Sequence, residues 1–207
     1  MKAERRRFSS LKAGLVCAAL AAVCAPAMAQ ETEKRTENVG TAPITDSASQ
    51  DSSIGIKELF PQYRLVGKSR LTFWGIQVYD ASLWTTPAFK ANTLSSQSFA
   101  LELVYLRDFE SKKIAEKSIS EMRRSTAITD AQAKAWTLEL MRVIPDIKKG
   151  DRVLGENRPD VGAVFRVNGK PSGEIRDVEF ARLFFGIWLS PQTSEPKLRS
   201  ALMAGVI

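Results

Sequence analysis

The chain has 207 residues, with 30 Lys and Arg against 23 Asp and Glu, two Cys and no His. Both cysteines, Cys17 and Cys24, lie within the first 29 residues, which we expect the cell to remove. The remaining protein would have no thiol, no disulfide, no Cys/His zinc site and no His general base, which excludes most familiar hydrolase and metalloenzyme mechanisms.

Residues 1–29 have the pattern of a secretory signal peptide. Basic residues precede the apolar run Leu15–Ala25, which is too short to span a bilayer at about 20 residues. Ala27-Met28-Ala29 follows as a small-x-small cleavage site, so Gln30 would become the new terminus. Removal of residues 1–29 leaves 25 basic and 22 acidic residues. We expect a periplasmic or secreted protein with no stable membrane insertion after cleavage.

Residues 30–53 are expected to form a disordered polar linker. They contain no aromatic residue and too few apolar side chains to offset the entropy of ordering. Residues 54–207 then form one domain of ordinary size. All four tryptophans and nine of the ten phenylalanines fall in this domain, so a sizeable core is available.

Two segments have strand patterns. Arg70–Trp84 is rich in β-branched and aromatic residues, with Gly75 as a bulge or bend inside it. Phe99–Leu106 alternates, so that Phe99, Leu101, Leu103 and Tyr105 share one face. The alternation predicts a strand with that face on a core.

Two helices are expected to follow. Ser111–Arg124 has an apolar stripe and a charged opposite side. Thr129 and Gln132 have the spacing of a capping box, which opens a helix that runs to about Val143 before Pro145.

The C-terminal third predicts strands and then helices. The expected strands are Arg152–Leu154, Val161–Val167 and Gly173–Arg176, the last two joined by a turn at Asn168-Gly169. Asp177 caps a helix over Val178–Leu189, and Ser194 caps one over Glu195–Met203. Hairpin strands with grouped helices indicate an α+β fold, an antiparallel sheet with helices on one face.

Most candidate chemistry in the sequence has a simple structural explanation. The basic residues of Ser111–Arg124 alternate with acids, which is typical of a solvated face rather than of nucleic-acid binding. Glycine-rich phosphate loops are absent, and the paired acids lie at loop or cap positions. No cofactor or metal is predicted.

Arginine and tyrosine remain as candidates. Tyr105 lies on the apolar face of its strand, and Arg70 opens a strand over Leu71–Tyr79. An arginine in an apolar cavity can hold a carboxylate or phenolate by charge-assisted hydrogen bonds. The alternative is that Arg70 points to solvent or pairs with a neighbouring acid.

Three stretches resemble the chalcone isomerase-like family, specifically its exported bacterial branch. The first is Gly67–Arg70 (GKSR) followed by Val78–Trp84 (VYDASLW), and the second is Leu101–Asp108 (LELVYLRD). The third runs from Gly173 through the helix to Pro196. The similarity covers about residues 57–204 in the same order.

The resemblance implies an open-faced β-sandwich, in which a large antiparallel sheet carries a layer of helices and a ligand cleft lies between them. Plant members cyclise chalcones, whereas other members bind fatty acids. The family arginine corresponds to Arg70, or to Arg64 in another register. The catalytic threonine falls at Trp74, with Thr72 nearby, and the catalytic tyrosine falls at Phe109 or Glu110, so the hydroxyls that would stabilise an enolate are largely missing.

The sequence therefore predicts non-catalytic binding of an apolar or fatty-acid-like small molecule, with no nucleic acid. The candidate ligand-binding residues are Arg70, Thr72, Tyr79, Tyr105, Phe109 and Lys113. One alternative is an isomerase of the intramolecular lyase type. Another is an interaction module whose cleft is filled by its own side chains.

Overall fold

A computed structural model describes residues 55–206. The expected signal peptide, the linker 30–53 and Ile54 lie outside the described residues. Six strands form one antiparallel sheet in which each strand pairs with the next in the chain. The strands are β1 (Arg64–Phe73), β2 (Ile76–Thr85), β3 (Phe99–Tyr105), β4 (Arg152–Arg158), β5 (Gly162–Val167) and β6 (Lys170–Ile175).

The segment expected to be one bent strand is a hairpin. β1 pairs antiparallel with β2, and Trp74 and Gly75 form the turn between them, with φ of 51° and 78°. Positive φ at both central residues is the pattern of a two-residue hairpin turn. The prediction of a continuous strand over Arg70–Trp84 is therefore wrong: the chain reverses at Gly75.

The other strands form where they were expected, with longer bounds for β4 and β6. β3 begins at Phe99, and its face of Phe99, Leu101, Leu103 and Tyr105 is buried, as the alternation predicted. Ala100 and Glu102 on the other face are buried as well. β5 and β6 meet at Asn168-Gly169, where φ is 50° and 78°. The two hairpin turns thus have nearly the same backbone geometry with different first residues.

The helices also agree closely with the sequence patterns. They are α2 (Ser111–Ser125), α3 (Asp130–Val143), α4 (Val178–Leu189), α5 (Pro196–Leu202) and an unexpected 3-10 helix, η1 (Ala91–Ser96). The capping box at Thr129 and Gln132 is present. The Asp177 side chain accepts the backbone N–H groups of Glu179 and Phe180, both at 2.9 Å. At α5 the N-cap is Glu195, and the hydroxyl of Ser194, the expected cap, donates to Glu121 instead.

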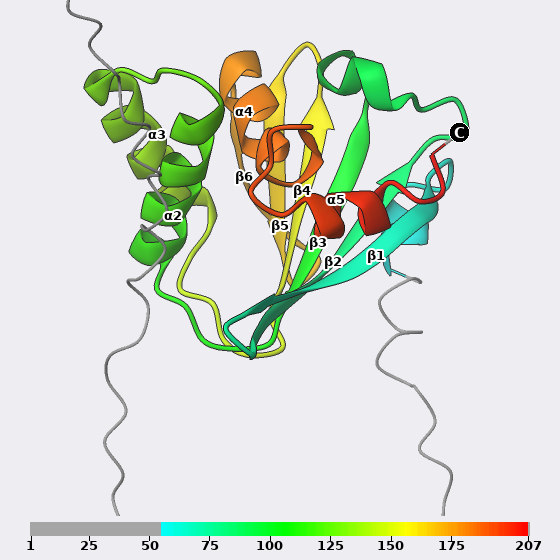
Figure 1. Ribbon diagram of the computed structural model, residues 1–207, viewed down its shortest axis with the longest axis horizontal. Coiled ribbons are helices and arrows are strands. Elements are labelled where there is room, and N and C mark those ends of the chain that lie inside the picture. The colour runs from blue at the N-terminus through cyan, green and yellow to red at the C-terminus, as the bar shows by residue number, and fades with distance from the viewer. Residues whose placement is uncertain (1–54, 207) are drawn as a thin grey trace, which may run out of the picture. The chain divides into compact units, whose positions relative to one another are not determined.

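Helices α4 and α5 lie on one face of the sheet, and α2 and α3 pair with each other beside α4 and β6 (Figure 1). The core between sheet and helices is strongly aromatic, and its buried rings include Phe99, Phe165, Phe180, Phe184 and Phe185. This arrangement confirms the predicted α+β architecture.

The opposite face of the sheet has its own small apolar cluster. Ile56, Phe60 and Tyr63 pack there against Trp84, Ala100 and Leu154. The Phe60 and Tyr63 rings stack with centroids 4.9 Å apart. Between residues 55 and 206, no helix has both the length and the apolar character needed to cross a membrane.

Candidate functional site

Three of the predicted site residues converge on the helix-facing side of the sheet. Tyr79 and Tyr105 are opposite each other in the β2–β3 register, with ring centroids 5.9 Å apart. Phe109 follows Tyr105 edge to face at 5.5 Å. The indole N–H of Trp188 on α4 donates to the Tyr79 hydroxyl at 2.8 Å. The cluster joins the sheet to α4.

Burial raises the pKa of both tyrosines in this cluster. For Tyr79 the loss of hydration outweighs the opposing effect of the Trp188 hydrogen bond, and for Tyr105 burial is the cause. The pKa of Tyr63, on the other face of the sheet, is also raised, chiefly by burial and then by the charge of Glu156. These are the chain's three tyrosines.

We therefore expect the folded protein to show no tyrosine ionisation near pH 10, where exposed tyrosines titrate. A raised folded pKa means that the stability linked to these groups is complete below about pH 10 and is lost as pH rises toward the folded values. Ultraviolet absorbance of phenolate, recorded for folded and urea-unfolded protein, measures this. A native titration that overlays the unfolded one would contradict the expected burial.

Arg70 does not enter an apolar cavity, which corrects the expectation for this residue. In β1 it is opposite Asp80, and its guanidinium donates to both Asp80 carboxylate oxygens at 2.6 and 2.8 Å. Since Asp80 follows Tyr79 in β2, its side chain lies on the face away from the helices. The Arg70 side chain is 46% exposed. The alternative that Arg70 pairs with a neighbouring acid is the one observed.

The other arginine considered, Arg64, is also exposed, and it donates to the Gly205 carbonyl at 3.3 Å. Thr72 is exposed in β1, just past a register shift at Leu71. Neither residue joins the tyrosine cluster.

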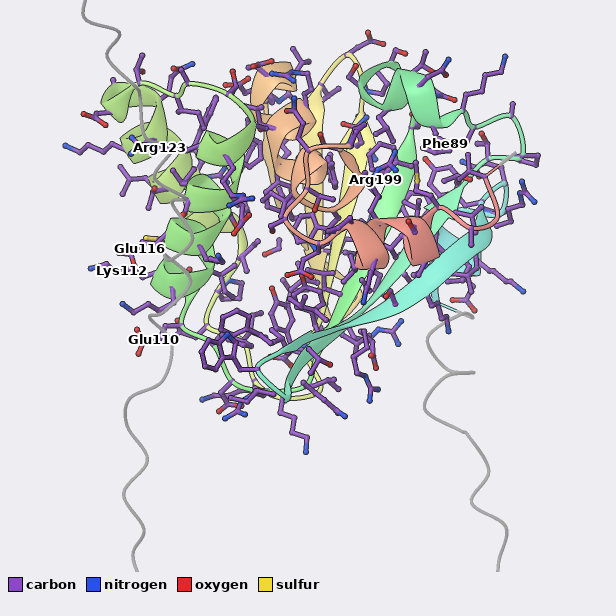
Figure 2. The ribbon with its side chains drawn as sticks, viewed as in Figure 1. Phe89, Glu110, Lys112, Glu116, Arg123 and Arg199 are labelled. Atoms are coloured by element: carbon purple, nitrogen blue, oxygen red, sulfur yellow. The ribbon has the colours of Figure 1, made fainter. Side chains whose placement is uncertain are left out.

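Lys113 lies on the exposed side of α2. Its ammonium is 3.7 Å from Glu116, which Lys112 also approaches at 3.9 Å. Figure 2 shows Lys112, Glu116 and Arg123 projecting from α2 away from the sheet. This is the solvated, mixed-charge face that the sequence predicted.

An apolar groove lies at a different place, between η1 and α4. Its volume is about 300 Å³, at the lower limit of small-molecule sites. The walls come from η1, the ends of β3 and β4, and α4. The lining residues are Ala91, Asn92, Leu94, Ser95, Phe99, Asn157, Ala181, Arg182, Phe185, Gly186, Leu189, Ser190 and Pro191.

Aromatic contacts hold the walls of the groove in place. Phe99 contacts Phe185 at 5.0 Å between ring centroids and Phe89 at 5.7 Å. Phe89, labelled in Figure 2, precedes η1 and fixes it over β3. Buried Asn157 donates to the Gln97 carbonyl at 2.8 Å, which holds the end of η1 to β4. The groove is therefore built by the fold rather than by a surface loop alone.

Arg182 is the cation that lines the groove. Its guanidinium makes two hydrogen bonds to Glu179, at 2.7 and 2.6 Å, and its side chain is about half exposed. At the other end of α4, Arg199 donates to the Leu189 carbonyl at 2.8 Å. Arg199 lies between α5 and α4 in Figure 2 and satisfies an otherwise open helix end.

Sequence patterns did not reveal the groove. Its η1 wall, Ala91–Ser96, has no apolar period or motif, and the apolar faces of β3 and α4 are equally consistent with plain core. Among residues 55–206 no group of three or more carboxylate, Cys or His side chains could hold a metal ion.

Comparison with known proteins agrees with the architecture. A solved structure of an Arabidopsis thaliana fatty-acid binding protein matches with a TM-score of 0.54 at 11% identity, covering 69% of this chain and 87% of that one. An uncharacterized protein of Haemophilus influenzae is 26% identical over 145 residues, 70% of this chain and 69% of the relative. The model of the chalcone isomerase-like family matches residues 61–204. The chain therefore belongs to the chalcone isomerase-like family.

Proposed function

We propose that this protein is exported and binds an apolar small molecule with a carboxylate group, without catalysing its conversion. The single observation that carries the proposal is the groove of about 300 Å³ between η1 and α4, with aromatic and aliphatic walls and Arg182 at its edge. An apolar chain would displace water from these walls, and the carboxylate would lie near the guanidinium.

Two further observations support binding rather than catalysis. The structural neighbour is described as a fatty-acid binding protein. Neither tyrosine of the cluster lines the groove, so neither phenol faces a ligand bound there. An isomerase would need hydroxyl donors facing a developing enolate. Turnover of a chalcone only at the uncatalysed rate is the result we expect.

Export is the second part of the proposal, and it is supported by the signal pattern of residues 1–29. N-terminal sequencing of protein from the periplasm or medium should begin at Gln30. Denaturing that protein and analysing the extract by mass spectrometry should release a carboxylate-bearing lipid.

A pair of neighbouring substitutions tests the groove. Ser95 is exposed and lines the groove, so Ser95→Trp should fill it and weaken binding of a fluorescent fatty acid at least tenfold. Ser96, also exposed, lies outside the lining, so Ser96→Trp is the matched control. Equal affinity in both variants would place the ligand elsewhere.

A second pair tests the head-group contact. Arg182→Gln should weaken fatty-acid binding by up to about fivefold, since an exposed cation contributes about 0.2–1 kcal/mol. Arg142 makes the equivalent pair with Glu139 on α3, so Arg142→Gln is the control. Arg70→Gln should also leave affinity unchanged, because Arg70 lies on the other face.

A further inference from the structure

The β1–β2 turn presents the most exposed large apolar side chain among the described residues. Trp74 is 86% exposed, and its neighbours Phe73 and Ile76 are 38% and 40% exposed. Phe73 and Trp74 contact each other with ring centroids 6.2 Å apart. A Cβ built on Gly75 would meet no atom within 4 Å. We name Phe73–Ile76 the apolar tip; it projects from the sheet with open space around its turn.

The fold itself does not require tryptophan at this position. Trp74 has φ of 51° and is followed by Gly75 at 78°, and the β5–β6 turn repeats this geometry with Asn168 at 50° and Gly169 at 78°. Positive φ is well tolerated by Asn and poorly by a bulky residue. The chain thus uses the favoured residue in one turn and a disfavoured, solvent-exposed one in the other.

The backbone strain at Trp74 is not offset by burial of its side chain in the protein, which indicates that the residue has a role other than stabilising the fold. The other three tryptophans of the chain are buried: Trp84, Trp136 and Trp188 are at most 7% exposed. An apolar side chain held in water at a convex tip gains free energy only when something else covers it.

The domain that carries the tip has a net positive charge. From residue 54 onward the chain carries 23 basic and 17 acidic residues. The tip lies at the end of the sheet where the turns before α2 and before β4 also lie, at the bottom of Figure 1. Basic residues slightly outnumber acids there, with Arg107, Lys148, Lys149, Arg166 and Lys170 against Asp108, Glu110, Asp146 and Asp151.

We propose that the apolar tip inserts into the interface of a lipid bilayer that contains anionic lipids. Tryptophan and phenylalanine are suited to the headgroup region, where an apolar ring meets a polar surface. A net positive domain is drawn to an anionic leaflet, with each nearby base contributing modestly. This proposal does not depend on the groove.

Vesicle binding tests the proposal directly. Protein purified from cells that express the full-length chain is mixed with vesicles of phosphatidylglycerol and phosphatidylcholine, and bound protein is sedimented. Wild type should bind the vesicles. Trp74→Asn should bind at least about tenfold more weakly, because it loses the indole that would be buried in the bilayer interface. Leu138→Gln removes another exposed apolar residue, 59% exposed on α3, and should bind like wild type.

Quenching by brominated lipid locates the contact. Since Trp74 is the exposed tryptophan of the described residues, vesicle-bound wild type should be quenched, and Trp74→Asn should not. Asn fits the turn, so this variant should unfold at the same or a higher temperature and cannot fail for lack of folding.

Three results of the vesicle experiments would overturn the proposal. They are no wild-type binding, equal binding of Trp74→Asn, and binding without quenching. Self-association of wild type without lipid that Trp74→Asn abolishes would also overturn it and assign the tip to a second copy of the chain.

Discussion

Replacing Gly162 with alanine is expected to destabilise the protein by roughly 3–5 kcal/mol, a large part of the stability of an ordinary domain. Gly162 has φ of 130°, which side-chain-bearing residues rarely adopt, and a Cβ there would lie 2.2 Å from the Ile175 carbonyl oxygen and 2.7 Å from the Asp177 nitrogen. Both neighbours are backbone atoms, so neither can turn aside. The strain and the clash therefore add.

The clash falls on a residue that joins α3 to α4. Asp177 caps α4 through Glu179 and Phe180, and its second carboxylate oxygen accepts the Trp136 indole N–H from α3 at 2.9 Å. Pushing Asp177 away would loosen α3 and α4 together. Urea unfolding followed by circular dichroism measures the change.

Gly169→Ala provides the control for this prediction. Gly169 also has positive φ, at 78°, but a Cβ there meets no atom within 4 Å. Only conformational strain remains, so the expected cost is about 1 kcal/mol. Similar losses in the two variants would show that close packing at Gly162 is unimportant.

Arg152→Met is expected to cost about 3–5 kcal/mol at neutral pH. Glu102 is 3% exposed in the middle of the sheet, and the Arg152 Nε donates to it at 3.0 Å. Removing the guanidinium leaves a buried carboxylate without its neutralising partner. On the same face, the Arg70–Asp80 pair is 46% and 40% exposed, so Arg70→Met should cost no more than about 1 kcal/mol.

The loss should depend on pH in a defined direction. Burial already raises the pKa of Glu102, and Arg152 opposes that rise, so the variant's pKa should be higher still. A raised folded pKa gives stability below the unfolded value, about 4.3, that disappears as pH rises through the folded value. The deficit of Arg152→Met should therefore be small below about pH 4 and grow toward neutrality.

A second substitution checks the cause. Glu102→Gln combined with Arg152→Met removes both charges and should recover much of the loss at neutral pH. Chemical denaturation of the three proteins across pH measures these effects. A deficit that is independent of pH, or that persists undiminished in the double variant, would assign the loss to packing of the arginine stem.

Local sequence signals were sufficient to predict most of the helices. The capping box at Thr129 and Gln132 and the Asp177 cap act within a few residues of the helix they begin, so the sequence pattern contains them. The alternating face of β3 was equally clear. The β1–β2 hairpin was missed because Trp74 is not a usual turn residue, and the aromatic, β-branched run continued through it.

The site was harder to predict for a different reason. The sequence named Tyr79, Tyr105 and Phe109 as candidate ligand-binding residues, and the structure brings these three together. Arg70, expected in an apolar cavity, lies on the other face. Which side a strand residue faces depends on pairing register, and a shift of one residue reverses it. The Arg70–Asp80 register belongs to a hairpin that the sequence had not revealed.

The amino-acid sequence by itself determined the α-helices, the caps at Thr129 and Asp177, the apolar strand faces and the family, because these depend on neighbours along the chain. Tertiary structure alone decided that Arg70 faces away from the helices and that η1 meets α4 across a groove. It also decided that Trp74 stands exposed at a turn. The physical reason is that pairing register and packing between distant segments set the direction of each side chain, and the local periodicity of a sequence predicts neither of them.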